Sequence, residues 1–228
     1  MGVGGPGVRH PQLVIFDCDG VLVDSEVISN DVLARSLTEQ GLPTTLAQAR
    51  RGYQGLLLSE VALRASAKLG RPLPEGWLAD YEAQRTAAFR AAPLRAVTGV
   101  AEAIRRIVAA GVAVCVASQG KLEKTRLSLQ LTGLAGLFAP AAVFSADEVP
   151  RGKPHPDLFR HAAAVMAAPP ARCVVVEDSP SGVTAGVAAG MRVLGYTVDS
   201  DEEALRAAGA ELLRSMSDLP GALGLELG

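Results

Sequence analysis

The chain has 228 residues, of which 49% are hydrophobic and 20% are charged, with 22 Lys and Arg against 24 Asp and Glu. This balance excludes the disordered, fibrous and membrane-embedded classes, and it provides no basic surface for nucleic acid. Only 4% of the residues are aromatic, which disfavours platforms for base stacking. We therefore expect a globular protein with one domain or two small ones and no nucleic-acid partner.

Residues 1–12 are rich in glycine and contain no apolar segment, so they are expected to form a disordered tail and neither a signal peptide nor a membrane span. The three cysteines, Cys18, Cys115 and Cys173, lie in or next to apolar runs without the spacing of a metal site. Reduced core thiols are the expected interpretation. We expect a cytoplasmic protein with no membrane partner.

The first expected strand, 13–16, is an uninterrupted apolar run that suits a buried parallel strand. It ends directly at Asp17 and Asp19, which Gly20 follows. An ionised carboxylate at the end of a buried strand must bind a cation or several hydrogen-bond donors. This requirement favours a functional role, although a turn or helix cap that uses Asp also fits such a short spacing.

Residues 25–93 carry helical patterns and no convincing strand, so we expect them to form a helical cap domain inserted after the first strand. Helices are expected over residues 25–40, 59–70 and 76–92. In the last of these helices, Arg85 shares a face with Tyr81 and Phe89.

From residue 98 onwards, helices and strands alternate. Strands are expected over residues 112–117, 141–144, 173–176, 192–196 and 210–213. The intervening helices are expected over residues 101–110, 121–132, 156–168, 182–190 and 202–208. One strand-helix unit before the insert and about four after it are typical of a doubly wound, Rossmann-like parallel α/β sheet. The catalytic core would comprise residues 13–24 and 94–228.

Polar residues follow the expected strands of this core at their carboxyl ends. Ser118 follows the second strand, Lys153 lies in a loop after the third, and Glu177 and Asp178 follow the fourth. In a doubly wound sheet these strand ends share one crevice with the two aspartates of the first strand. Because Mg²⁺ prefers one or two carboxylates together with water and phosphate oxygens, the set predicts a site for Mg²⁺ and a phosphorylated anion.

These residues could transfer a phosphoryl group. A carboxylate such as Asp17 can attack phosphorus and form an aspartyl-phosphate if cations neutralise the phosphoryl oxygens. Mg²⁺ and Lys153 would supply that charge, and Ser118 would hydrogen-bond a further oxygen. Asp19 could protonate the leaving oxygen and later activate water.

In this order and at these strand ends, the motif DCDG, then Ser118 and Lys153, and finally the motif EDSPSGVTAG resemble the haloacid dehalogenase-like (HAD) hydrolase superfamily. The resemblance covers nearly the whole chain after residue 12. The insert is similar to the small α-helical cap of phosphoglycolate phosphatase-like and β-phosphoglucomutase-like members. The resemblance implies that Asp17 is the nucleophile, that Asp19 is the general acid and base, and that Ser118 and Lys153 bind the phosphoryl group.

The same resemblance implies a metal site. Asp17, the backbone carbonyl of Asp19 and Asp178 would bind Mg²⁺, and Glu177 would be a direct or water-mediated ligand.

Substrate choice is expected to depend on the cap and on the residues after Ser118, among them Gln119 as a substrate-binding residue. Arginine binds carboxylate or phosphate bidentately, so the cap contributes further candidates. These candidates are Arg50, Arg51, Gln54 and Arg85, of which Arg85 is preferred because of its aromatic neighbours. Each of them could equally be a solvated helix residue that does not contact the substrate.

The sequence thus favours a Mg²⁺-dependent phosphatase that acts on a small phosphorylated metabolite, such as a sugar phosphate or phospho-sugar acid. A monomer or weak homo-oligomer is expected. The alternative is a β-phosphoglucomutase-like sugar phosphomutase. The mutases that the chain resembles carry a His where Ser29 aligns, and an Arg shortly after a glycine (Gly55 here), where Leu58 aligns.

Three other functions are disfavoured. A dehalogenase of this family needs no Mg²⁺ and generally lacks the second aspartate, so the presence of Asp19 and Asp178 opposes this function. A phosphonate hydrolase needs a Schiff-base lysine in the cap, where Lys68 is the only lysine and nothing else marks it as reactive. A binding or regulatory module without activity would have lost part of such a set of residues.

Overall fold

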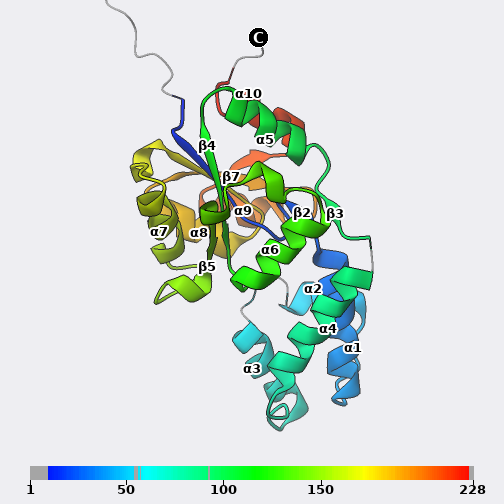
Figure 1. The fold of residues 1–228 in the computed structure, drawn as a ribbon. Helices are drawn as coiled ribbons and strands as arrows, with labels where there is room; N and C mark the ends of the chain where they lie inside the picture. Colours follow the sequence, from blue (N-terminus) through cyan, green and yellow to red (C-terminus); the bar gives the residue numbers. More distant parts are fainter. Residues whose placement is uncertain (1–9, 54–55, 57, 92, 226–228) are drawn as a thin grey trace, which may run out of the picture. The chain divides into compact units, whose positions relative to one another are not determined.

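The computed structural model describes residues 10–53, 56, 58–91 and 93–225 (Figure 1). Gln54 and Gly55, which were considered above, lie outside the described residues. The chain divides into two compact units, one formed by Met1–Val23 and Ala96–Gly228 and the other by Asp24–Arg95. The second unit begins one residue before the expected helical insert and ends two residues after it.

The first unit contains a six-stranded sheet in the order β5-β4-β1-β6-β7-β8, in which all neighbouring strands are parallel. Its strands are β1 (Leu13–Phe16), β4 (Ala113–Ser118), β5 (Val143–Ser145), β6 (Cys173–Glu177), β7 (Arg192–Tyr196) and β8 (Glu211–Leu213). The chain passes from β1 through β4 to β5 on one side and then crosses to β6 on the other. The predicted doubly wound α/β fold is confirmed.

The strand β1 lies at the centre of the sheet, and all four of its side chains are fully buried. Phe16 is level with Val116 of β4 and with Val176 of β6. The three central strands therefore end at similar heights, and the residues that follow them meet at one edge of the sheet.

Helices and short 3-10 turns connect the strands of this unit. The helices are α5 (Val100–Ala109), α6 (Leu122–Leu131), α7 (Asp157–Val165), α8 (Pro180–Ala188), α9 (Glu202–Ala208) and α10 (Leu219–Ala222). The 3-10 turns are η1 (Ala135–Leu137), η2 (Pro140–Ala142), η3 (Ala146–Glu148), η4 (Pro170–Arg172) and η5 (Met216–Asp218). One hydrophobic cluster joins the sheet to α7, α8 and α9, with Leu158 and Phe159 of α7 fully buried in it. The three cysteines are buried free thiols, as the sequence predicted.

The second unit contains four helices among its described residues, whereas three were expected. They are α1 (Glu26–Glu39), α2 (Leu46–Tyr53), α3 (Leu58–Leu69) and α4 (Trp77–Ala91). The missed helix α2 buries only Ala49 and Tyr53, so its apolar pattern is weak. A capping box precedes it, because Thr45 N donates to Gln48 Oε1 at 2.8 Å and Gln48 N donates to Thr45 Oγ1 at 3.3 Å.

Two short strands, β2 (Val23–Asp24) and β3 (Arg95–Ala96), pair with each other where the chain passes between the units. At the start of the first unit, Gln12 N donates to Arg172 O at 2.8 Å, so the last residue of the expected tail is hydrogen-bonded to the core. None of the helices in the described ranges is long and apolar enough to cross a membrane.

Candidate active site

Asp17 and Asp19 lie in a tight turn at the end of β1. Asp17 N donates to Val176 O at 3.0 Å, which continues the pairing of β1 with β6. The turn then closes as the backbone N–H groups of Leu22 and Val23 both donate to Cys18 O at 2.9 Å. These contacts place the Asp17 carboxylate at the carboxyl edge of the sheet, where it is buried. The Asp19 side chain remains partly exposed.

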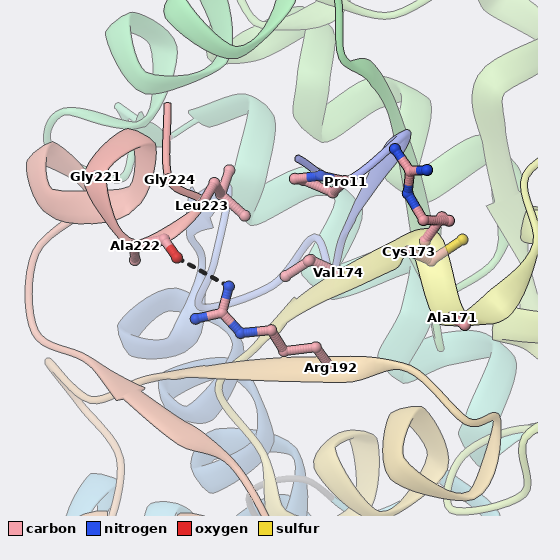
Figure 2. A pocket seen from close by; sticks show the side chains of 10 residues that line it. Pro11, Ala171, Cys173, Val174, Arg192, Gly221, Ala222, Leu223 and Gly224 are labelled. Atoms are coloured by element: carbon pink, nitrogen blue, oxygen red, sulfur yellow. Dashed lines mark hydrogen bonds between the residues drawn. The ribbon is translucent and has the colours of Figure 1, made fainter. Parts of the chain in front are cut away.

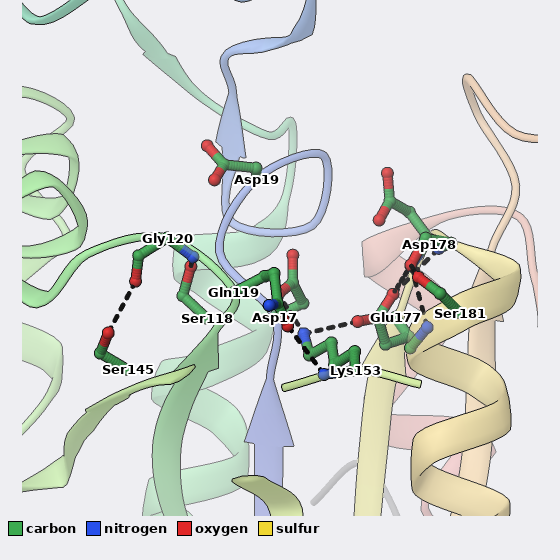
Figure 3. Close-up of polar contacts among 12 residues, drawn as sticks. Asp17, Asp19, Ser118, Gln119, Gly120, Ser145, Lys153, Glu177, Asp178 and Ser181 are labelled. Atoms are coloured by element: carbon green, nitrogen blue, oxygen red, sulfur yellow. Dashed lines mark hydrogen bonds and ion pairs between the residues drawn. The ribbon is translucent and has the colours of Figure 1, made fainter. Parts of the chain in front are cut away.

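Lys153 lies between two buried carboxylates. Figure 3 shows the lysine side chain between Asp17 and Glu177. Its Nζ donates to Asp17 Oδ1 at 2.5 Å and to Glu177 Oε1 at 2.6 Å. All three side chains are at least nine-tenths buried. Lysine is almost never buried unless it is paired, and here two partners compensate for its desolvation. The predicted phosphate-binding lysine and the predicted nucleophile are therefore in direct contact.

One lysine does not fully compensate for this carboxylate cluster. Burial raises the pKa of Asp17 to about 7, with Lys153 opposing the rise and Glu177 and Asp19 adding to it. Burial alone would lower the pKa of Lys153, but Asp17 and Glu177 outweigh that effect and raise it. Further positive charge beside Asp17 would restore its carboxylate form, which a nucleophile requires.

Glu177 connects this cluster to the start of α8. Its Oε2 accepts hydrogen bonds from Asp178 N and Ser179 N at 2.9 Å and from Ser179 Oγ at 3.0 Å. A side chain at Gly182 would overlap the Glu177 carboxylate. Both oxygens of Glu177 thus accept from protein donors, which favours a structural role in orienting Lys153 over direct metal binding.

Asp178 lies against the turn that carries the two aspartates, because a side chain at Gly20 would overlap the Asp178 carboxylate. Gly20 has a φ of +79°, a left-handed conformation that suits glycine. No group of three or more His, Cys, Asp or Glu side chains in the described part of the chain is arranged to hold a metal by itself. Asp17 and Asp178 provide two carboxylates, a number that fits Mg²⁺ but not a metal that requires an all-protein cage.

Ser118 ends β4, and its side chain is buried beside the following loop. Its Oγ accepts a hydrogen bond from Gly120 N at 3.1 Å, which leaves the hydroxyl proton for an acceptor such as a phosphoryl oxygen. Ser145 Oγ donates to Gly120 O at 2.9 Å and so fixes the same loop. Gln119 Oε1 accepts from Lys153 N at 2.8 Å, so this side chain orients the Lys153 loop. A substrate contact of Gln119 stays a prediction.

The sequence reasoning missed Lys124. This residue lies on α6, is 7% exposed, and forms an ion pair through Nζ with Asp19 Oδ2. A helical lysine is usually solvated. The signal that could have revealed it is its place on the buried face of α6 together with Thr125, Ser128 and Leu129.

Comparison with known protein families agrees with this arrangement. Residues 11–190 match the family model described as haloacid dehalogenase-like hydrolase. The chain belongs to this family. The resemblance that the sequence motifs indicated is thereby confirmed, and the protein is a HAD-like hydrolase.

Known relatives of this HAD-like hydrolase include phosphoric monoester hydrolases, the enzyme class that the sequence predicted. It is 29% identical to the 6-phosphogluconate phosphatase of Escherichia coli (strain K12), over 92% of this chain and 93% of that protein. It is 30% identical to hexitol phosphatase A of the same organism, over 82% of this chain and 83% of that protein. The crystal structure of a HAD family hydrolase from Deinococcus radiodurans R1 with bound phosphate and sodium is 34% identical with a TM-score of 0.78, over 95% of this chain and 98% of that chain.

Arg85 lies in the second unit of the HAD-like hydrolase. Its guanidinium group lies 5.3 Å from the centre of the Tyr81 ring, and its Nε is buried without a hydrogen-bond partner in the described structure. Tyr81 also stacks on Trp77, with 5.8 Å between ring centres. Lys68 Nζ lies 4.8 Å from the centre of the Tyr53 ring, an aromatic contact that does not activate an amine for Schiff-base chemistry.

A cavity of about 330 Å³ lies at the opposite ends of the strands, near the amino ends of β6 and β7 (Figure 2). None of the predicted site residues lines it. Arg192, which borders it, donates to Glu211 at 2.8 and 2.6 Å and to Ala222 O at 2.9 Å. These contacts make the region a structural contact between β7, β8 and α10.

Gly20→Ala is expected to reduce stability and activity together. A left-handed conformation costs a residue with a side chain about 1 to 2 kcal/mol, and the new methyl group would also displace Asp178. Gly111→Ala is the control, because Gly111 has a φ of +80° but no atom within 4 Å of the added carbon. Urea unfolding should show a loss of stability for both variants that is at least as large for Gly20→Ala, and phosphatase assays should show a loss of activity for Gly20→Ala alone. Equal activity in the two variants would contradict the position given to Asp178.

Proposed function

We propose that this HAD-like hydrolase is a Mg²⁺-dependent phosphatase that hydrolyses a small phosphorylated metabolite, a sugar phosphate or phospho-sugar acid, through an aspartyl-phosphate on Asp17. The observation that carries the proposal is the buried Asp17 carboxylate held by Lys153, which Glu177 orients in turn. The phosphatase activities of the relatives from Escherichia coli support the same reaction.

In the first step, Asp17 attacks phosphorus. Lys153 fixes Asp17 Oδ1, and the other carboxylate oxygen forms the bond to phosphorus while the bond to the substrate oxygen breaks. Asp19 donates a proton to the departing oxygen. Lys153 and the Ser118 hydroxyl bind phosphoryl oxygens and stabilise the charge that they carry.

In the second step, water attacks the phosphorus of the aspartyl-phosphate. Asp19 takes a proton from that water, the bond between Asp17 and phosphorus breaks, and the Asp17 carboxylate is restored together with inorganic phosphate. Asp19 thus changes from acid to base, which returns the enzyme to its starting protonation.

The residues of the site fit Mg²⁺. Two lysines pair with three of the carboxylates: Lys153 with Asp17 and Glu177, and Lys124 with Asp19. Asp178 adds a fourth carboxylate beside the turn at Gly20. Asp17, Asp178 and the backbone carbonyl of Asp19 would hold the ion, whose charge would neutralise phosphoryl oxygens during attack by a carboxylate. Glu177 would act through Lys153 and at most through a bound water.

For the substrate, we propose a polyhydroxylated phosphate monoester with or without a carboxylate. The names of the two relatives from Escherichia coli support this class. Arg85 is proposed to bind the substrate's carboxylate or hydroxyl groups, because its buried Nε lacks a partner and its guanidinium is held on Tyr81. Arg50 and Arg51 remain further candidates.

The test is phosphate release from a panel of sugar, hexitol and sugar-acid phosphates, with Mg²⁺ and with a chelator. Release from a few members of the panel, lost by more than about 100-fold on chelation, is expected. The panel includes β-glucose 1-phosphate with a glucose 1,6-bisphosphate primer. Formation of glucose 6-phosphate without phosphate release would instead identify a mutase. The sequence disfavours this result, because Ser29 and Leu58 occupy the positions where the mutases carry a His and an Arg.

A further inference from the structure

The second buried lysine of the active site, Lys124, has no role in the reaction derived above. Its side chain is 7% exposed, and such burial is unusual for a lysine without compensating charge. The partner that the structure provides is Asp19, through Nζ and Oδ2. Each of the two aspartates at the end of β1 therefore contacts a lysine of its own.

The path of the Lys124 side chain is fixed by its surroundings. A carbon added to Gly120 would lie 3.3 Å from Lys124 Cδ, 3.7 Å from its Nζ and 3.4 Å from Ser118 Oγ. The lysine therefore runs along the loop that follows β4. Thr125, the next residue of α6, is fully buried, and its Oγ1 donates to Lys121 O at 3.1 Å, which anchors the start of the helix.

The partner carboxylate needs such an anchor more than Asp17 does. The side chain of Asp19 is 30% exposed, against 10% for Asp17. A partly exposed aspartate can occupy several rotamers, and a base that must accept a proton from water needs a fixed position. A buried ammonium group on a rigid helix restricts the carboxylate to one of them.

We propose that Lys124 is a positioning residue that fixes the Asp19 carboxylate for the second step, the attack of water on the aspartyl-phosphate. The inference rests on the proposed phosphatase function. In that step, water oxygen bonds to phosphorus, its proton passes to Asp19, and the bond between phosphorus and Asp17 breaks. Lys124 acts on the reaction through its ion pair with Asp19.

The test uses the full chain with p-nitrophenyl phosphate, whose good leaving group makes the first step nearly independent of an acid. Lys124→Met should lower kcat about 10- to 100-fold and lower KM with it, leaving kcat/KM within about threefold, because only base catalysis in the second step is impaired. Rapid mixing should show a burst of nitrophenolate close to one equivalent of enzyme. Lys124→Arg should restore part of kcat, and Lys124→Gln serves if the Met variant does not fold.

Arg126→Met, at an exposed position of the same helix, is the control and should match the wild type. In an Asp19→Ala background, Lys124→Met should cause no further loss, because the lysine acts through the aspartate. An unchanged kcat, a change confined to KM, or independent losses in the double variant would overturn the inference. If the wild type and Arg126→Met release no phosphate from any substrate, the proposed function itself fails.

Discussion

Asp17→Asn is expected to lower kcat by at least about 10⁴-fold, because a neutral amide cannot form the aspartyl-phosphate and residual binding groups do not replace a nucleophile. The fold should persist. Glu177 still pairs with Lys153 in this variant, and burial already raises the pKa of Asp17 to about 7, so a neutral side chain suits the position. We expect the free energy of unfolding to change by less than about 1 kcal/mol.

The measurement compares phosphate release and urea unfolding for Asp17→Asn and for Asp147→Asn, which alters an exposed aspartate of the same unit. The second variant should retain wild-type activity. Mg²⁺-dependent turnover of Asp17→Asn within tenfold of the wild type would show that another group is the nucleophile.

Lys153→Met is expected to have the largest effect on stability. The substitution leaves Asp17 and Glu177 buried side by side without their shared cation. Removal of one partner of a buried ion pair costs about 3 to 5 kcal/mol, since the remaining charge loses its compensation. Phosphoryl binding is lost as well, and kcat/KM should fall by about 10³-fold or more.

Urea unfolding of Lys153→Met measures this loss, and two further variants locate its cause. Lys121→Met changes an exposed lysine of the same unit and should shift stability by less than about 0.5 kcal/mol. Adding Glu177→Gln to Lys153→Met removes one uncompensated charge and should recover part of the loss. A Lys153→Met variant as stable as Lys121→Met would mean that the carboxylates are neutral in the folded protein.

The sheet and the central part of the site were predictable from the sequence for a simple physical reason. A fully apolar strand such as β1 is buried on both faces, and in a parallel sheet the residues after neighbouring strands meet at one edge. The register, with Phe16 level with Val116 and Val176, realises that expectation. Asp17 and Glu177 are therefore close although 160 residues separate them in the chain.

The contacts that sequence reasoning missed depend on tertiary packing. The pairing of Gln119 with Lys153 N joins two loops that lie 34 residues apart, and no local pattern specifies it. Lys124 resembles a solvated helix residue unless the buried face of α6 is known.

The strand β5 begins at Val143 and not at Ala141, because Pro140 starts the turn η2 and delays the strand.

The measurement that tests the central claim most directly is acid quenching of the enzyme during turnover, followed by mass spectrometry of its peptides. We predict that the peptide containing Asp17 gains one phosphoryl group, that hydroxylamine removes it as expected for an acyl phosphate, and that Asp17→Asn lacks it. A variant with a slower second step, such as Lys124→Met, should accumulate more of the phosphorylated peptide. Full turnover without phosphate on this peptide, or phosphate on another residue, would contradict an aspartyl-phosphate mechanism at Asp17.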